Sequence, residues 1–188
     1  RYPELLRLEM AENYGAEGEL AGSVASRAGG ILAMNANGFQ DPDGKGSGGQ
    51  LAGWCMAQGE EHGYHFGGDV YQRIELSENG FDCRIVPASD PVGEGTYNAV
   101  EFTPVLIRDG EKIEDSFWTG EQPRACFGTG DQGIYMLVIE GRYPDEGIRG
   151  TSVNTCADIL LAYGCRNAIN MDGGSSAILW YDGEYVTQ

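Results

Sequence analysis

Basic residues are scarce in this chain of 188 residues. It has 12 lysines and arginines against 29 aspartates and glutamates, which gives a formal net charge of −17. A surface this acidic repels nucleic acid and anionic lipid, and no basic stripe offsets it. We therefore expect no nucleic-acid partner, and we expect anionic ligands to bind only where a local arginine holds them.

Long apolar runs are also absent. No segment approaches the roughly 18–20 apolar residues that span a bilayer, so we expect no membrane contact by this fragment. The chain begins at Arg1, and an export signal or anchor removed before that residue would leave no trace.

The usual signatures of metal and cofactor sites are missing too. The five cysteines form no C-x-x-C pair, which disfavours structural zinc, and His62 and His65 lack a third strong ligand. No Walker loop or dinucleotide fingerprint occurs. We expect no metal and no required cofactor, with a divalent cation such as calcium among Asp41, Asp43 and Asp69 as the minor alternative. The cysteines leave two states open: buried free thiols, or one or two disulfides such as Cys156–Cys165.

The composition suits one folded domain with a sizeable core. Apolar residues make up 41% of the chain, and 30 glycines predict many turns. We predict a single α+β domain with a mixed, mostly antiparallel sheet, one principal helix and a few short helices. Residues 1–24 would be an N-terminal helical segment or tether, and residues 25–188 the main domain.

Hydrophobic periodicity places the elements along the chain. Helical spacing is seen at 4–12, in a short turn at 23–28 ended by Gly29-Gly30, and most clearly from Thr151 or Ser152 to Gly164. Strands are predicted at 31–34 (buried), 69–76, 81–86, 99–107 continuing into 111–113, 134–139 and 167–171, with the very apolar 134–139 at the centre of a sheet. Turns at 78–80 and 109–110 would make antiparallel hairpins, and residues 35–53 form a long polar, glycine-rich loop.

The segment after the last of these strands carries the strongest chemical signal. It reads Asp172-Gly173-Gly174-Ser175-Ser176. A tight turn of this composition can present several main-chain N–H groups to an anion beside a carboxylate. The alternative is an ordinary hairpin turn that uses Asp-Gly only for its tolerance of positive φ.

Four polar side chains elsewhere lie where predicted strands begin or end. Asn35 follows an apolar strand and suits either sugar hydroxyls or its own turn. Arg124 enters a strand and suits either a phosphate or a surface ion pair. Glu140 and Arg142, separated by one glycine, close the apolar strand and suit either a site or a simple turn.

Taken in order, these segments resemble the phosphodiester glycosidase domain family. The matching stretches cover about residues 25 to 183 and read Asn35-Ala-Asn-Gly-Phe39, Thr103-Pro-Val-Leu106 with Asp109-Gly110, Arg124-Ala-Cys-Phe-Gly128, Glu140-Gly-Arg142 and Asn167-Ala-Ile-Asn-Met-Asp-Gly-Gly-Ser-Ser176. Three positions depart from the family pattern. Ser175 replaces a third glycine, Glu140 replaces the usual aspartate, and Ala36-Asn37 alters the first turn.

The resemblance implies hydrolysis of a sugar-1-phosphodiester, such as an N-acetylglucosamine-1-phosphodiester, at its glycosidic C–O bond. It implies catalytic roles for Asp172 and Glu140. Substrate binding would fall to the remaining set, which comprises Arg124, Arg142, Asn35, Asn170, Gly173, Gly174, Ser175 and Ser176. The partner would be a sugar phosphate or glycan outside the cytoplasm, in the cell envelope or an exported polysaccharide. The competing hypothesis is a non-catalytic module that binds glycan or assists exopolysaccharide assembly with the same pocket.

Overall fold

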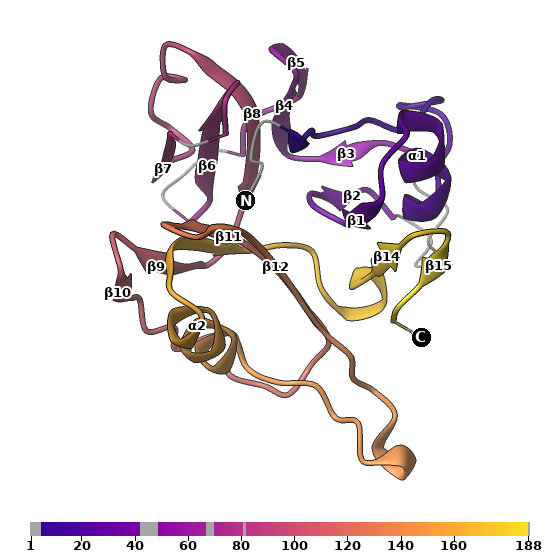
Figure 1. The fold of residues 1–188 in the computed structure, drawn as a ribbon, viewed down its shortest axis with the longest axis vertical. Coiled ribbons are helices and arrows are strands. Elements are labelled where there is room, and N and C mark those ends of the chain that lie inside the picture. Colours follow the sequence, from indigo (N-terminus) through magenta and orange to yellow (C-terminus); the bar gives the residue numbers. More distant parts are fainter. Residues whose placement is uncertain (1–4, 42–48, 67–69, 81, 188) are drawn as a thin grey trace.

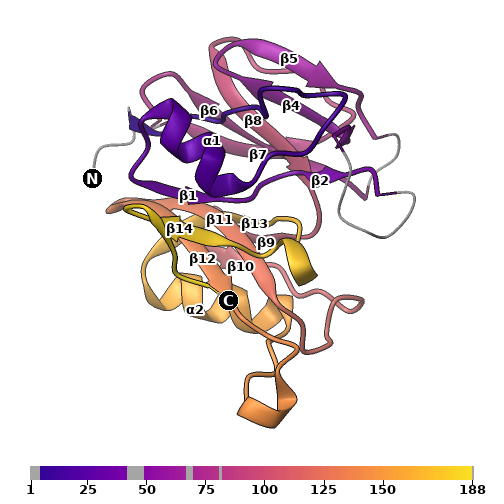
Figure 2. The same cartoon turned by 90° about the vertical axis from the view of Figure 1, so that its right-hand side faces the viewer.

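The structure is a computed structural model that describes residues 5–41, 49–66, 70–80 and 82–187. Two five-stranded antiparallel sheets pack face to face, and helix α2 covers the free face of the second (Figures 1 and 2). We call the sheet in the order β5-β4-β8-β6-β7 the outer sheet and the one in the order β10-β9-β13-β11-β12 the central sheet. A small sheet (β1-β14-β15) and helix α1 lie beside them, with β2 and β3 forming a further short pair.

The elements have the following bounds. The outer sheet consists of β4 (Trp54–Ala57), β5 (Glu60–Gly63), β6 (Gln72–Ser77), β7 (Cys83–Pro87) and β8 (Thr96–Phe102). The central sheet consists of β9 (Val105–Arg108), β10 (Glu111–Lys112), β11 (Arg124–Gly130), β12 (Gly133–Ile139) and β13 (Cys165–Asn170). The other strands are β1 (Leu32–Met34), β2 (Gly38–Phe39), β3 (Leu51–Ala52), β14 (Leu179–Tyr181) and β15 (Glu184–Tyr185). The helices are α1 (Ala21–Ala28), α2 (Val153–Ala162) and the 3-10 turns η2 (Pro144–Glu146) and η3 (Gly174–Ser176).

The core lies between the two large sheets. Ile74 and Val100 of the outer sheet meet Val105, Phe127 and Ile169 of the central sheet in one cluster. A second cluster fills the space between the central sheet and the buried face of α2. Strands β9, β11, β12 and β13 of the central sheet therefore contribute side chains to both clusters, as alternating side-chain directions allow.

Helix α2 forms where the apolar spacing predicts it. The Ser152 hydroxyl caps it by accepting from Thr155 N at 3.1 Å, and Val153, Cys156 and Leu160 are buried. Tyr163, which lies inside the predicted span from Thr151 or Ser152 to Gly164, comes after the helix and is 71% exposed. The short helix predicted at 23–28 is also confirmed as part of α1, which ends in left-handed Gly29.

The two predicted hairpins are confirmed, but the strand predicted at 99–107 is divided into two. β6 pairs with β7, and β9 pairs with β10 across a turn in which Asp109 and Gly110 have positive φ. The predicted strand 99–107 is split at Thr103-Pro104, where the chain leaves the outer sheet and enters the central one. A proline that lacks an N–H suits this break.

Several predictions about the sheets are wrong. All described strand pairs are antiparallel, so the sheet is not mixed, and there are several sheets rather than one. β12 lies at the edge of the central sheet, and β13 takes a central place. The strand at 31–34 is on the surface side, since Ile31 is 70% and Leu32 is 44% exposed.

The helix predicted at 4–12 does not form over its described part. Residues 6–11 are not part of a helix, and Leu6 and Leu8 pack on the main core while Leu5 is 75% exposed. Apolar contacts two residues apart fit an extended segment better than a helix. Leu8 N also donates to Asn98 Oδ1 at 3.2 Å, which ties the segment to β8.

Candidate active site

The Asp172–Ser176 turn leaves the carboxyl end of β13 and is held against the end of β1. Asp172 N donates to Ala36 O at 3.1 Å, and Asn35 Nδ2 donates to Asp172 O at 2.5 Å. The Asn35 Oδ1 atom accepts from Ile178 N at 3.0 Å, on the far side of the turn. One amide side chain thus clamps both ends of the turn. This is the bracing alternative for Asn35, because both ends of its amide are already engaged.

The carboxyl group of Asp172 is partly shielded from water. Burial raises its pKa, while the Ser176 side chain and the Gly173 N–H donate to the carboxylate and limit that rise. A carboxylate with a raised pKa is a stronger base than an exposed one. The structure therefore brings Asp172, Gly173 and Ser176 together around one titratable group.

The main-chain amides of the turn do not form the outward fan predicted from the sequence. Gly174 N donates to Pro123 O at 3.0 Å, and Ser176 N donates to Gly173 O at 3.1 Å. With Gly173 N on the Asp172 carboxylate, three of the four N–H groups from Gly173 to Ser176 already have acceptors within the protein. These three amides therefore do not form the predicted anion cradle.

A guanidinium covers the same turn. A side chain at Gly174 would meet Arg142 Nη2 at 3.1 Å and Nη1 at 3.3 Å, so the Arg142 head group lies directly on this glycine. Gly174 also has φ +62°, which favours glycine. Arg142 donates from Nε (3.0 Å) and Nη2 (2.9 Å) to Gln122 Oε1. Gln122 is a contact that sequence reasoning missed, because a lone glutamine before a strand carries no signal.

Arg124 and Asn170 lie next to the turn along the chain or the sheet, but their side chains bond to other parts of the fold, and their predicted substrate-binding roles stay predictions. The Arg124 guanidinium donates to three carbonyls near the start of α2, those of Thr151, Gly120 and Trp118, at 3.0, 2.9 and 3.3 Å. Arg124 is 5% exposed. Strand alternation turns its side chain toward α2, so it stabilises the loop there.

The Asn170 side chain is likewise buried and hydrogen-bonded within the fold. It is 3% exposed, and its Nδ2 donates to Thr103 O at 2.9 Å. This bond joins β13 to the point where the chain passes between the two large sheets. A buried amide bonded in this way is not available to a sugar.

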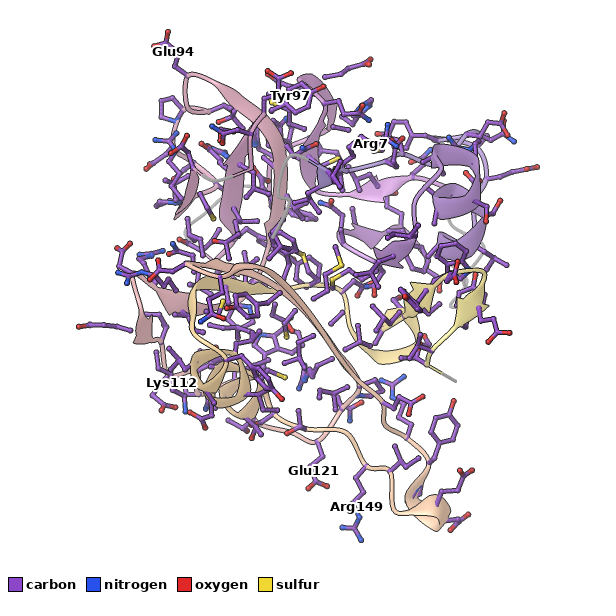
Figure 3. The ribbon with its side chains drawn as sticks, viewed as in Figure 1. Arg7, Glu94, Tyr97, Lys112, Glu121 and Arg149 are labelled. Atoms are coloured by element: carbon purple, nitrogen blue, oxygen red, sulfur yellow. The ribbon has the colours of Figure 1, made fainter. Side chains whose placement is uncertain are left out.

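Glu140 follows Ile139, which pairs with Arg124 in the β11–β12 ladder. It comes just before the arm formed by residues 141–150, which projects from the body (Figures 1 and 3). Its predicted role as partner of Asp172 stays a prediction.

A large groove opens beside the turn. It has a volume of about 1850 Å³, and its lining includes Asp172, Ser175, Ser176 and Asn35. Arg142 is not among its described lining residues. Ser175 is exposed, whereas Ser176 is half-buried. The acid is thus reached from the groove, while the guanidinium lies over the next part of the turn.

The histidines have other partners. His65 Nδ1 contacts Glu101 Oε1 at 2.5 Å and stacks on Trp54, while His62 packs edge-on against Tyr14. No cluster of three or more metal-binding side chains occurs within the described residues. Asp43 and Asp69, two members of the predicted calcium alternative, lie outside those residues. In the part of the chain described, no helix is long and apolar enough to cross a membrane.

All five cysteines are free thiols, and four of them are buried. Burial raises the pKa of Cys55 to about 12 and of Cys165 to about 11. The alternative of a Cys156–Cys165 disulfide is not realised.

The structure thus combines a two-sheet α+β fold with a half-buried carboxylate on a turn that an arginine covers. The phosphodiester glycosidase family model matches residues 28–188. The chain therefore belongs to the phosphodiester glycosidase family.

Two solved structures extend this result to the fold. The catalytic domain of zebrafish N-acetylglucosamine-1-phosphodiester alpha-N-acetylglucosaminidase, auto-inhibited by its pro-peptide, is similar with a TM-score of 0.71 at 18% identity. That match covers 96% of this chain and 64% of the zebrafish chain. A hypothetical protein from Synechocystis is similar with a TM-score of 0.63 at 16% identity, covering 100% of this chain and 55% of the other. This chain thus spans less than two thirds of either relative's length. No curated protein matches it.

Proposed function

We propose that this protein is a hydrolase that cleaves the glycosidic C–O bond of a sugar-1-phosphodiester, with an N-acetylglucosamine-1-phosphodiester as the model substrate. The single observation that carries the proposal is the Asp172 turn. It joins a carboxyl group of raised pKa to a surface covered by the Arg142 guanidinium. Membership of the phosphodiester glycosidase family suggests which bond is cleaved, and the name of the similar zebrafish enzyme suggests the sugar.

The reaction needs a water molecule and two charged groups. Water adds to the anomeric carbon, the bond from that carbon to the phosphate oxygen breaks, and a phosphomonoester leaves. Asp172 accepts the water proton or stabilises the oxocarbenium-like transition state. Arg142 offsets the charge that develops on the leaving phosphate. Because this leaving group is a weak base, charge stabilisation matters more than a strong general acid.

The proposal assigns the supporting positions as follows. Ser176 and Gly173 orient the Asp172 carboxylate by donating to it, and Gly174 lets the guanidinium approach. Ser175, exposed at the groove, contacts the sugar. Glu140 is retained as the second carboxylate. The substrate is a glycan of the cell envelope or an exported polysaccharide, so the protein would be found outside the cytoplasm on cell fractionation.

The test is release of free sugar from a synthetic α-N-acetylglucosamine-1-phosphodiester. Asp172→Asn should lower kcat by about 10²–10⁴-fold, and Arg142→Gln should lower kcat/KM by at least about tenfold. Asp145→Asn and Arg149→Gln are matched controls, because both residues are exposed on the projecting arm; Figure 3 shows Arg149 directed away from the body. Unchanged turnover by Asp172→Asn would eliminate the assignment.

A second function is favoured by one observation. The N–H groups of Gly173, Gly174 and Ser176 already have acceptors within the protein, so these three amides add nothing to an anion site. A non-catalytic glycan-binding or polysaccharide-assembly module would need only the groove. In that case the protein would bind the diester in calorimetry and release no sugar, and Asp172→Asn would leave binding unchanged.

A further inference from the structure

Arg142 has a backbone conformation that its local sequence does not explain. Its φ is +69°, in the left-handed region that a bulky side chain rarely adopts. The other described residues of this kind that are not glycines are Gln58, Asp109 and Asp182. Each of those three precedes a glycine in a two-residue hairpin turn, where a positive φ is normal. Arg142 stands in no such turn, so its surroundings must hold it in this conformation.

The base of the projecting arm (residues 141–150) packs tightly against Gln122. Gly150 has no room for a side chain, because a Cβ atom there would run into the Gln122 main chain. Gln122 and Thr151 also exchange two main-chain hydrogen bonds, with N–O distances of 3.2 and 2.9 Å. The backbone of Gln122 is therefore fixed, and this fixes the point from which its side chain extends.

The Asp172 turn is attached to the next residue along the chain. Gly174 N donates to Pro123 O at 3.0 Å, and a Cβ atom at Gly173 would lie 2.8 Å from that same oxygen. Glycine at position 173 thus lets the turn lie directly on Pro123. Because Gln122 and Pro123 are consecutive, the base of the arm and the Asp172 turn share one support.

The Arg142 guanidinium lies flat over this turn. A Cβ atom at Gly174 would lie 3.4, 3.3 and 3.1 Å from Cζ, Nη1 and Nη2, and distances this similar place the planar group face-on to the glycine. Gln122 Oε1 accepts from Nε and Nη2, at 3.0 and 2.9 Å. A guanidinium has five N–H donors, and the remaining three have no acceptor within the described residues. The edge between Nη1 and Nη2 is therefore open to a ligand.

The partner of Arg142 is uncharged, although the chain is rich in acids. Most described arginines that have a side-chain partner pair with a carboxylate, namely Arg7, Arg27, Arg73, Arg84 and Arg166. The Gln122 amide oxygen accepts hydrogen bonds as a carboxylate does, but it leaves the positive charge of the guanidinium uncancelled. Both side chains are exposed, so an anion can reach the guanidinium from solvent.

We propose that Gln122 is a positioning residue for an anion subsite at Arg142. Its amide oxygen holds the guanidinium flat over Gly174 without neutralising it, and the open edge of the guanidinium binds two oxygens of one phosphodiester monoanion. The left-handed backbone of Arg142 belongs to the same arrangement, because the side chain reaches the Asp172 turn from that conformation. Only the identity of the anion, a phosphodiester, rests on the proposed function.

The experiment measures binding of diethyl phosphate, a phosphodiester monoanion that has no glycosidic bond. The 188-residue chain is titrated at pH 7 in about 0.1 M salt, and binding is followed by phosphorus NMR. Gln122→Glu keeps the shape of the side chain and adds one negative charge beside the guanidinium. We expect at least about threefold weaker binding, which corresponds to the repulsion of two unit charges about 6 Å apart in water.

Gln132→Glu is the matched control for charge. Gln132 is also exposed, and it lies just before β12, at the opposite end of that strand from Arg142. Seven residues of strand span about 23 Å, well beyond the Debye length of about 10 Å at this salt concentration. Gln132→Glu should therefore change the dissociation constant by less than about 1.5-fold.

Two further variants separate positioning from repulsion. Gln122→Ala removes the acceptor without adding charge, and it should weaken binding by at least about twofold because the guanidinium is no longer held in one orientation. Arg142→Gln removes the charge and should abolish detectable binding. All the substituted positions are exposed, so the melting temperatures should stay close to that of the parent.

Any of four results would overturn the proposal. They are no detectable binding by the parent, equal binding by the parent and Gln122→Ala, equal losses in Gln122→Glu and Gln132→Glu, and undiminished binding by Arg142→Gln. The proposed reaction fails separately. Binding of diethyl phosphate without release of sugar from the synthetic substrate would refute that reaction and support the anion subsite.

Discussion

Replacing Arg73 by methionine tests the charged network of the outer sheet. Arg73 is fully buried, and its Nε and Nη1 atoms lie 2.7 Å from Glu75 Oε1 and 3.3 Å from Glu101 Oε1. Both acids are also buried. The methionine keeps most of the stem volume and removes the charge, so two carboxylates remain without their buried counter-charge.

The expected cost follows from that loss. Removing one partner of a buried ion pair typically costs about 3–5 kcal/mol. Glu101 depends on Arg73 all the more, because its buried Oε2 atom has no hydrogen-bond partner within the described structure. We expect Arg73→Met to lose at least about 3 kcal/mol in the free energy of unfolding.

Arg84→Met is the matched control. Arg84 binds the same acid, with Nε 2.6 Å from Glu75 Oε2, but its side chain is 51% exposed. Water can replace an exposed partner, so we expect a loss of about 1 kcal/mol or less. Urea unfolding followed by tryptophan fluorescence measures both variants. Equal losses would refute the argument that burial sets the cost.

Three further outcomes are expected. Gly174→Ala should lower the free energy of unfolding by about 1–2 kcal/mol, because an alanine is strained at φ +62°, and it should lower turnover by displacing the adjacent guanidinium. The control Gly120→Ala places its new methyl group with no atom within 4 Å and should change stability by less than about 0.5 kcal/mol. Equal stabilities of the two variants would contradict this. Burial raises the pKa of Asp172 above 3.8, so the stability it contributes is complete below that pH and is lost as pH rises through the folded pKa; Asp172→Asn should therefore melt higher than the parent at pH 7 and not at pH 3.5. Hydrogen bonds, above all the one from Arg27, lower the pKa of Glu19 from 4.5 to about 2, so the stability that Glu19 contributes is present above pH 4.5 and is lost as pH falls toward 2. Arg27→Gln should therefore flatten the melting temperature against pH in this range. An unchanged slope would contradict a role for the Arg27–Glu19 pair.

Local signals in the sequence predicted the elements whose stability is local. The capped, apolar-striped α2 and the hairpin at Asp109-Gly110 follow from side-chain spacing and turn chemistry within a few residues. The same holds for the turn at Asp172, whose composition marks it as a site candidate.

The directions of the site side chains needed the tertiary structure. Arg124 and Arg142 both stand beside candidate turns in the sequence, but strand alternation and the carbonyls near α2 draw Arg124 away. Arg142 lies over Gly174 because residues 141–150 leave the sheet there and Gln122 fixes its head group. Gln122 is 20 residues from Arg142 and Thr151 is 27 residues from Arg124, and partners this far apart leave no periodic signal.

By itself, the sequence indicated an acidic α+β fold of the phosphodiester glycosidase family and marked the Asp172 turn as the candidate site. Only the tertiary structure decided which groups reach that carboxyl, and that the apolar strand β12 lies at an open edge. The physical reason is that hydrophobic periodicity along the chain indicates which side chains are buried. Pairing between strands that are distant in the sequence decides which neighbours bury them.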